Sequence, residues 1–479
     1  MKTLLNYLTW MVAGIALLTM MSCRKHLLDP VPSDKISDKI AFATPERILA
    51  QVHGMYQGVK DGRFLGGRGL INNDVRGEEW LNVTTNNVTA FDAWNHTLNS
   101  TSERVQQLWV FGYFAINRIN VVLQGLKDNP TVIPASLATR YEAEGKFLRG
   151  VSYFYLVTLY GKKPYTFDNG ANPGLPLRLQ AETNPASAHL ERSSVAEVYQ
   201  QILSDLDFAE ANLPLSYEAA GDTNVVRAHR NAAIAFKTRV YLNMGKYAEL
   251  ITEANKIVPA TAPFQATSGR PHRLEPNFVS LFRAPYTLAE SIFSFPMTNT
   301  SGPGTQNGIA LYHNTEYELN ATGIIGNPSF TVNDSRKLLV QITGGRTRYT
   351  KFNSDNDNYV PIIRYAEVLL NLAEGLARTN SGIDSRAGAL LNVVRQRSDP
   401  TITFSIASFA DKQELIDAIL RERRLELLGE GVRSMDLLRL GLLIPAKGAA
   451  QAVPANSNAY VWPIPQDELL YNNKMTTNE

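Results

Sequence analysis

The chain contains one cysteine, Cys23, so no disulfide can form within it. A polypeptide of 479 residues can bury enough apolar surface to be stable without such a bond. Hydrophobic residues make up 44% of the chain and charged residues 19%, which is typical of a globular protein. The formal net charge of +2 gives no sign of the basic face that favours nucleic-acid binding. We therefore expect a large body that is held together by hydrophobic packing.

The residues before Cys23 are typical of an export signal. A positively charged start is followed by an apolar run from Trp10 to Met21 and by the small residue Ser22. The run is shorter than the roughly 20 residues of a membrane-spanning helix. A cysteine directly after the small residue resembles a bacterial lipobox, so residues 1–22 are predicted to be a lipoprotein signal peptide and Cys23 the lipid attachment site. The alternative is an ordinary signal peptide with a chance cysteine.

A short tether is predicted after the cysteine. Pro30 and Pro32 favour an extended segment that holds the body away from a membrane. We expect residues 23–40 to be the lipidated N-terminus and tether. No low-complexity linker divides the rest, so residues 41–479 are predicted to form a single domain.

Most of this body shows the periodicity of α-helices. Thr44 followed by Pro45 is a helix-start signal, and Gly161 followed by Pro164 is a helix exit. Apolar residues at helical spacing recur throughout the chain. The predicted helical segments are residues 44–59, 105–122, 143–160, 195–213, 231–244, 248–258, 365–378, 387–397 and 415–427.

Two pairs of these segments resemble tetratricopeptide units. Residues 231–244 and 248–258 flank a Gly-x-Tyr turn that begins at Gly245, and residues 365–378 and 387–397 form the second pair. The irregular spacing of the pairs excludes a simple solenoid. The predicted fold class is therefore mostly α: a helical scaffold with tetratricopeptide-like helix pairs and two long loop-rich insertions.

No sequence motif indicates catalysis. None of the seven histidines has a second histidine three or four residues later, which argues against a zinc enzyme. Neither a Gly-x-Ser-x-Gly elbow nor a phosphate-binding loop occurs. Glu78 with Glu79, or Asp355 with Asp357, could form the carboxylate pair of a glycoside hydrolase, but we interpret them as solvated loop charges. We expect no catalytic residue, no metal and no cofactor.

The segment Arg421–Leu427 alternates arginine and glutamate on an amphipathic helix. Such alternation favours ion pairs between packed helices over a basic binding motif. We therefore predict a structural role for these charges.

Several short strings follow one another along nearly all of the chain, and their order and spacing together resemble the SusD/RagB family of Bacteroidetes outer-membrane lipoproteins. Any one of them alone would be a weak match. The strings are Leu27–Pro32, Ala143–Arg149, Tyr153–Val157, Tyr160–Tyr165, Pro361–Leu370, Arg421–Leu427 and Pro463–Glu468.

The resemblance implies a non-enzymatic binding protein that is lipid-anchored in the outer membrane and exposed at the cell surface. Family members cover a SusC-like TonB-dependent transporter as a lid and deliver glycans, or in some cases peptides, into it. One departure is that Arg24, Lys25 and His26 are basic, where surface-exposed lipoproteins of this phylum often carry acidic residues. A binder of peptide or another nutrient, an exported glycan hydrolase and a protein-binding helical scaffold remain as alternatives.

The two loop-rich insertions, residues 61–99 and 261–358, are the places where we expect a ligand site, because loops on a rigid scaffold usually carry binding residues. Aromatic side chains can stack on the apolar faces of sugars, while Asn, Asp and Arg hydrogen-bond their polar rims. Trp80 and Trp94 lie in the first of these insertions, and the alternative to ligand contact is that they pin its loops to the helices. The predicted ligand-binding residues are Asn73, Asp74, Arg76, Trp80, Trp94, Tyr286 and Tyr312.

Overall fold

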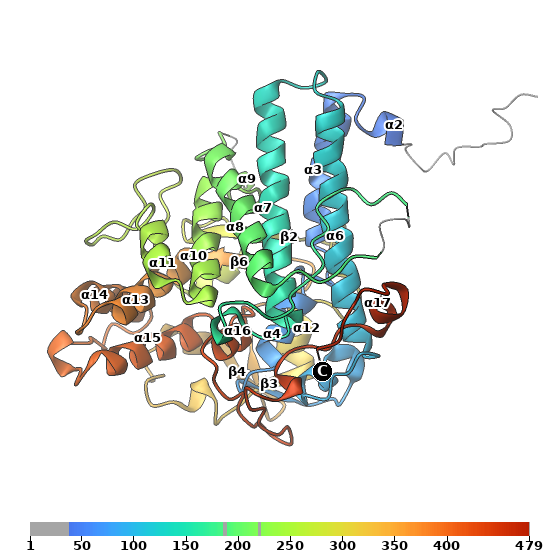
Figure 1. Cartoon of the computed structure of the whole chain (residues 1–479). Coiled ribbons are helices and arrows are strands. Elements are labelled where there is room, and N and C mark those ends of the chain that lie inside the picture. The colour runs from blue at the N-terminus through green and yellow to red at the C-terminus, as the bar shows by residue number, and fades with distance from the viewer. Residues whose placement is uncertain (1–37, 185–188, 219–221, 479) are drawn as a thin grey trace, which may run out of the picture.

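The computed structural model describes residues 38–184, 189–218 and 222–478 (Figure 1). The predicted signal peptide, the predicted lipid attachment site Cys23 and nearly all of the predicted tether lie outside these ranges. Within the described ranges, no helix combines the length and the apolar character that crossing a membrane requires.

The described residues are mostly α-helical, which confirms the predicted fold class. The tetratricopeptide likeness of the helix pairs stays a prediction. The helices before residue 260 are α2 (Asp38–Ala41), α3 (Pro45–Val59), α4 (Arg68–Val75), α5 (Phe91–Trp94), α6 (Glu103–Asp128), α7 (Ala135–Tyr160), α8 (Val195–Asn212), α9 (Thr223–Val226), α10 (Arg230–Met244) and α11 (Tyr247–Ala254). The later helices are α12 (Ile309–Leu311), α13 (Tyr365–Thr379), α14 (Ser385–Ser398), α15 (Lys412–Glu426), α16 (Arg433–Arg439) and α17 (Gln466–Tyr471).

Strands in the described ranges form three two-stranded antiparallel sheets, in which β1 pairs with β3, β2 with β6 and β4 with β5. In the first sheet Trp80 lies opposite Leu319, so the two insertions are joined to each other. The strands are β1 (Trp80–Asn82), β2 (Ser291–Met297), β3 (Tyr317–Leu319), β4 (Val340–Thr343), β5 (Arg346–Tyr349) and β6 (Asn358–Arg364).

The prediction that residues 61–99 are only loops is wrong in part, because this insertion contains α4 and α5 as well as β1. Every residue of α4 is buried. A helix that is covered on all sides needs no polar face, so it lacks the amphipathic period by which helices are recognised in a sequence.

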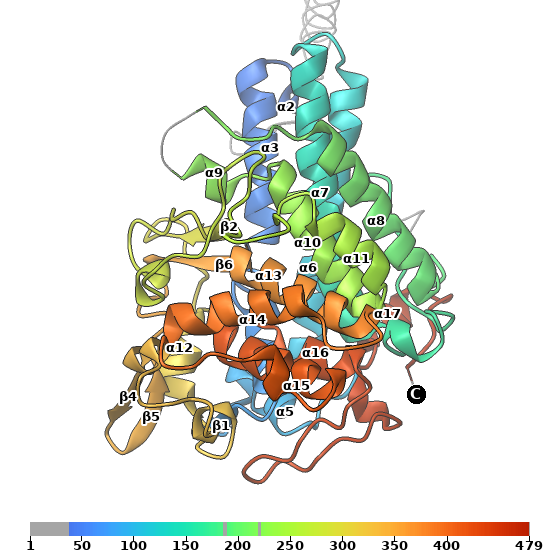
Figure 2. The ribbon, with the colours of Figure 1, turned by 90° about the vertical axis from the view of Figure 1, so that its left-hand side faces the viewer.

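Helices α3, α6 and α7 stand side by side and extend beyond the rest of the molecule (Figure 1). From α7 the chain passes through α8, α10, α11, α13 and α14, and each of these helices packs on the next (Figure 2). The two predicted pairs are present as consecutive antiparallel helices, α10 with α11 and α13 with α14. This helical body supports the insertions and the C-terminal segment at one end.

Local sequence signals explain several helix boundaries. Thr44 caps α3 through a hydrogen bond from the Arg47 amide to its hydroxyl, with Pro45 at the first helical position, as predicted. Ser194 and Glu197 form a reciprocal capping box at the start of α8. At the end of α10, Gly245 adopts a φ of +68°, which glycine tolerates better than other residues.

The C-terminal segment closes the end of the helical body. The Trp462 amide donates a 2.8 Å hydrogen bond to the Leu159 carbonyl, and the Asn478 side chain donates one of 2.9 Å to the Tyr160 carbonyl. One hydrophobic core cluster contains buried residues from Ala41 to Ile464. The first and last parts of the described chain therefore share a core.

A buried network of charges crosses the C-terminal half, and we refer to it as the Arg364 network. Arg364 forms ion pairs with Glu290, Glu426 and Glu430, and its Nη2 lies 2.7 Å from Glu430 Oε1. The predicted structural role of the charges in α15 is thereby confirmed for Glu422 and Glu426. The members are Glu290, Asp334, Arg336, Lys351, Arg364, Arg395, Arg397, Glu422, Glu426 and Glu430.

The Arg364 network contains five basic and five acidic side chains, and each acidic side chain lies against a basic one. Burial would raise the pKa of Glu426, but Arg397, Arg364 and Arg336 together lower it well below its usual value. Charge–charge attraction therefore exceeds the cost of removing this carboxylate from water.

Candidate ligand-binding site

Trp80 and Trp94 anchor the first insertion to the body of the protein. The Trp80 indole stacks on the His313 imidazole with 4.3 Å between ring centroids. Trp94 donates a 2.8 Å hydrogen bond from Nε1 to the Trp80 carbonyl. Their exposed fractions are 1% and 4%. This burial favours the interpretation that the two rings pin the loops, and ligand contact by either ring stays a prediction.

Asn73 and Asp74 are buried on α4. The Asn73 amide donates a 2.9 Å hydrogen bond to the Gly69 carbonyl, and the Asp74 carboxylate accepts one of 2.9 Å from the Gly431 amide. Burial raises the pKa of Asp74 well above its usual value, although the Gly431 hydrogen bond opposes this shift. The Asn73 bond lies within α4, and the Asp74 bond ties α4 to the turn before α16.

The two predicted tyrosines are buried in different places. Tyr286 stacks on Tyr359 of β6, with 4.9 Å between ring centroids, and its hydroxyl donates to the Asp357 carbonyl at 2.8 Å. Tyr312 stacks on Tyr317 of β3, with 5.9 Å between ring centroids. The structure therefore brings Tyr312 close to β1 but leaves Tyr286 against a separate sheet.

Glu78 and Glu79 are not the solvated loop charges that we expected. Both are buried, and Arg424 Nη2 lies 2.8 Å from Glu78 and 2.7 Å from Glu79. Arg433 binds Glu78 as well. Two arginines that lie far away in the sequence therefore hold these carboxylates, and no local pattern around residues 78–79 could reveal them.

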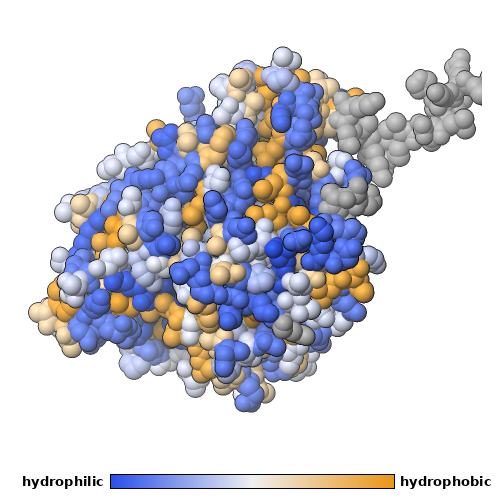
Figure 3. Space-filling model, viewed as in Figure 1, coloured by the Kyte–Doolittle hydropathy of each residue, from blue (hydrophilic) through white to orange (hydrophobic). Residues whose placement is uncertain are grey.

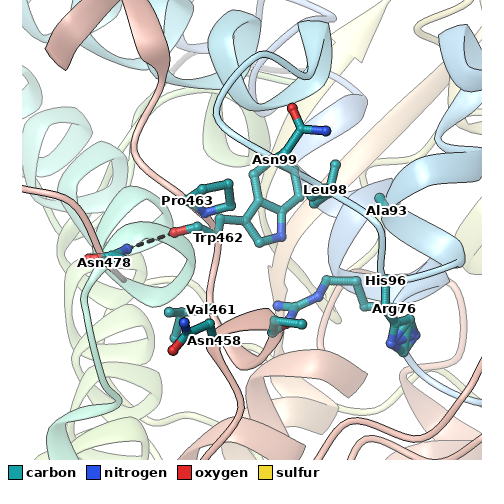
Figure 4. Close-up of a pocket in the computed structure, with 11 residues that line it drawn as sticks. Arg76, Ala93, His96, Leu98, Asn99, Asn458, Val461, Trp462, Pro463 and Asn478 are labelled. Carbon is teal, nitrogen blue, oxygen red and sulfur yellow. Dashed lines mark hydrogen bonds between the residues drawn. The ribbon is translucent and has the colours of Figure 1, made fainter.

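Arg76 lines a cavity of about 130 Å³ between the first insertion and the C-terminal segment (Figure 4). His96 and Trp462 line it as well, and Asn99 and Asn458 are exposed residues of its wall. We refer to it as the Arg76 cavity. Of the predicted ligand-binding residues, Arg76 is the one that lines this cavity.

Lys447 lies beside the Arg76 cavity, and burial and Arg76 lower its pKa well below its usual value. Lys447 donates to the carbonyls of Val75, Arg76 and Gly77 at 2.6–2.7 Å, and its Nζ lies 3.2 Å from His96 Nε2. Burial, Lys447 and Arg76 lower the pKa of His96 to about 3, so the imidazole is neutral at neutral pH. Burial lowers the pKa of Arg76 to about 10, so its guanidinium remains charged there.

Sequence reasoning missed the residues that complete this cavity. His96 occurs among six other scattered histidines, and Trp462 lies beside the Pro463-Ile464-Pro465 string that carried the family resemblance. Neither position has a spacing that would connect it to Arg76. Across residues 38–184, 189–218 and 222–478, no cluster of three or more His, Cys, Asp or Glu is arranged to hold a metal ion.

Comparison with known proteins identifies the family. Residues 28–242 match the family described as starch-binding associating with outer membrane, and residues 307–479 match the SusD family. A SusD superfamily protein from Bacteroides fragilis has a solved structure that is 32% identical, with a TM-score of 0.82 over 91% of this chain and 99% of that one. The chain therefore belongs to the SusD/RagB family.

Two further relatives span most of the chain. SusD-like protein P2 of Formosa agariphila is 25% identical over 97% of both chains. The starch-binding protein SusD of Bacteroides thetaiotaomicron is 23% identical over 79% of both chains.

Proposed function

We propose that the protein captures glycans at the surface of the outer membrane and passes them unchanged to a SusC-like TonB-dependent transporter. The observation that carries this proposal is the match of residues 28–242 to a family described as starch-binding associating with outer membrane, together with the match of residues 307–479 to the SusD family. The starch-binding relative from Bacteroides thetaiotaomicron supports a carbohydrate as the ligand.

The proposal includes the layout of the chain. Residues 1–22 direct export and are removed, Cys23 carries the lipid, and residues 23–40 tether a single domain of residues 41–479. Lipid chains contribute roughly 0.8 kcal/mol for each buried CH₂, so a multiply acylated cysteine would hold the protein firmly at a membrane.

We place the glycan at the opening of the Arg76 cavity. Asn99 and Asn458 are exposed there and can hydrogen-bond sugar hydroxyls. Arg76 lies within reach of a group that enters the cavity. The other six predicted residues are given a supporting role, because packing and internal hydrogen bonds already engage the side chains described above.

Exposed apolar side chains on α6 and α17 support a protein partner. Apolar residues are visible over part of the α6–α7 hairpin (Figure 3). Val110 and Phe114 on α6 are 47% and 52% exposed, and Leu470 and Tyr471 on α17 are 67% and 75% exposed. The indole of Trp109 on α6 donates to the carboxylate of Glu468 on α17, so these side chains lie on adjoining elements. Exposed apolar groups of this kind are common where proteins associate.

The test is calorimetric titration of the full chain in detergent with a panel of oligosaccharides and peptides, followed by product analysis of each mixture. We expect at least one glycan to bind and to be recovered intact. Hydrolysis of the bound glycan would overturn the non-enzymatic role, and binding of peptides alone would overturn the ligand class.

Two exposed asparagines allow the site to be tested without disturbing the core. Asn99→Ala and Asn458→Ala should each weaken glycan binding about threefold to tenfold, the usual value of one hydrogen bond. Asn333→Ala is the matched control, because Asn333 is exposed and does not line the cavity. Equal affinities for all three variants would place the glycan elsewhere. The transporter partner is tested by purifying the protein from membranes. We expect a large transporter to co-purify with the wild type and not with the Leu470→Asp variant.

A further inference from the structure

The Arg76 cavity contains hydrogen-bond donors that have no acceptor. Arg76 is 3% exposed, and its Nη2 donates to the carbonyls of Ala459 and Tyr460 at 3.1 and 2.9 Å. Its Nη1 is buried and has no partner. Trp462 is fully buried, and its indole Nε1 has no partner either. Buried donors are almost always satisfied in folded proteins, so two unpaired donors on one cavity require an explanation.

The two groups lie on facing sides of the same space. Figure 4 shows the indole nitrogen of Trp462 directed towards the guanidinium of Arg76 across the cavity. Both N–H groups can therefore reach one bound molecule.

The His96 imidazole lies beside these two donors. Lys447 donates to three backbone carbonyls, and its Nζ lies 3.2 Å from His96 Nε2. His96 Nδ1 is buried without a partner as well.

The charge of Arg76 is also uncompensated. No ion pair joins Arg76 to a carboxylate of the described residues, and the one ionisable group that favours its charged form is Tyr460. Lys447, a second buried basic group, lies behind the cavity, and burial and Arg76 lower its pKa well below its usual value. Leaving a buried guanidinium unpaired is costly, because removal from water is not offset by a counter-charge.

We propose that the Arg76 cavity is an oxyanion-binding site that takes a carboxylate group. A carboxylate only accepts hydrogen bonds, as the two unpaired donors of Arg76 and Trp462 require, and its planar shape suits a guanidinium. A neutral sugar hydroxyl would bring a donor of its own and no charge. The cavity volume of about 130 Å³ leaves room for a carboxylate and part of the molecule that carries it.

The carboxylate has two possible sources, a sugar acid or a free small acid. The anion site itself rests on the cavity alone, and only its use by a glycan rests on the proposed function. The two sources can be separated by titrating glucuronate and acetate independently. Glucose serves as the neutral control, and failure of the whole glycan panel described above would affect the proposed function without affecting the anion site.

The experiment follows the indole N–H signals of the full chain, labelled with ¹⁵N at tryptophan, by NMR at neutral pH. Glucuronate should shift the Trp462 signal, and glucose at the same concentration should not. If acetate produces the same shift, a free carboxylate is sufficient. If glucuronate alone does so, the sugar ring contributes to binding. No shift with either acid, or an equal shift with glucose, would overturn the proposal.

A matched pair of variants tests the geometry. Trp462→Phe keeps an aromatic ring but removes the N–H, and it should weaken binding of the acid that shifts the signal about tenfold, as expected for a hydrogen bond to a charged group. Trp80→Phe makes the same chemical change at a buried indole whose N–H is also unpaired but does not line the cavity. Equal affinities in the two variants would remove Trp462 from the site. Arg76→Gln should abolish binding, and the Trp462→Phe result remains decisive if that variant does not fold.

Discussion

The Arg364 network and the Arg76 cavity are both buried, but they treat charge in opposite ways. In the network, Arg364 is 2% exposed and forms ion pairs with three glutamates. In the cavity, Arg76 is 3% exposed, and no carboxylate of the described residues forms an ion pair with it. Arg364 and Arg76 are therefore equally buried, but they differ in whether the protein supplies a counter-charge. A cation whose counter-charge lies inside the protein holds the fold together, whereas one without a counter-charge is available to a ligand.

The largest effect should come from breaking the network. Arg364→Met leaves Glu290, Glu426 and Glu430 without this partner, so we expect a loss of about 3–5 kcal/mol in the free energy of unfolding. Urea unfolding measures the loss. Arg421→Met is the control in the same region of α15, because no ion pair of Arg421 is found among the described residues. A loss below about 1 kcal/mol for Arg364→Met would contradict the structural role of the network.

A smaller effect is expected from the same change in the cavity. Arg76→Met removes two hydrogen bonds to carbonyls but also removes an unpaired buried charge. These effects oppose each other, so we expect a loss of about 1–2 kcal/mol in the absence of ligand. The two variants should be compared by urea unfolding in the same buffer. Equal losses for Arg76→Met and Arg364→Met would erase the distinction between the two regions.

The two regions should also respond to different ranges of pH. The pKa of His96 falls from 6.5 to about 3 on folding, so between these values the unfolded chain binds a proton that the folded chain does not. Stability is therefore lost as the pH falls from 6.5. The lowered pKa values of Glu426 and Glu430 act in the same direction, but their stabilisation is lost only below about pH 4.5.

His96→Gln tests this difference. The free energy of unfolding of the wild type falls between pH 7 and pH 5, and we expect the fall to be about 1 kcal/mol smaller in the variant. Urea unfolding at each pH measures both values. His189→Gln, the same substitution at an exposed position, is the matched control. A variant that follows the wild-type curve would show that His96 does not titrate in this window.

The smallest effect is expected where both charges face solvent. Lys474 and Glu191 form an ion pair of 3.6 Å with side-chain exposures of 51% and 76%. Lys474→Met should change the free energy of unfolding by less than about 0.5 kcal/mol, because water and salt screen exposed pairs. A loss as large as that of Arg76→Met would mean that exposure does not govern the strength of these pairs.

The sequence predicted those features that depend on nearby residues. Apolar spacing indicated the long helices, and Thr44 with Pro45 placed the start of α3. The alternating charges of Arg421–Leu427 predicted ion pairs between packed helices, and Arg395 and Arg397 of α14 form such pairs with Glu422 and Glu426 of α15. The position of α4 was missed because a fully buried helix lacks a polar stripe.

The candidate site was predicted less well, because its residues come from distant parts of the chain. Arg76 was chosen for its side-chain type, and its position opposite Trp462 across a cavity depends on how the C-terminal segment returns to the first insertion. The aromatic composition of the insertions suggested sugar platforms. Trp80 and Tyr312 stack on His313 and Tyr317 inside the protein, and composition alone cannot separate such packing from ligand contact, which stays a prediction.

The C-terminal segment also sets the order in which the chain can complete its fold. Gln466 and Trp462 donate backbone hydrogen bonds to Ser100 and Leu159, which joins the end of the chain to α6 and α7. Contacts between residues so distant in sequence form late and slow the folding of a protein. During synthesis, the ends of α6 and α7 must wait for residues 462–466 to be made. A chain that lacks this segment exposes apolar surface, which makes it prone to aggregation.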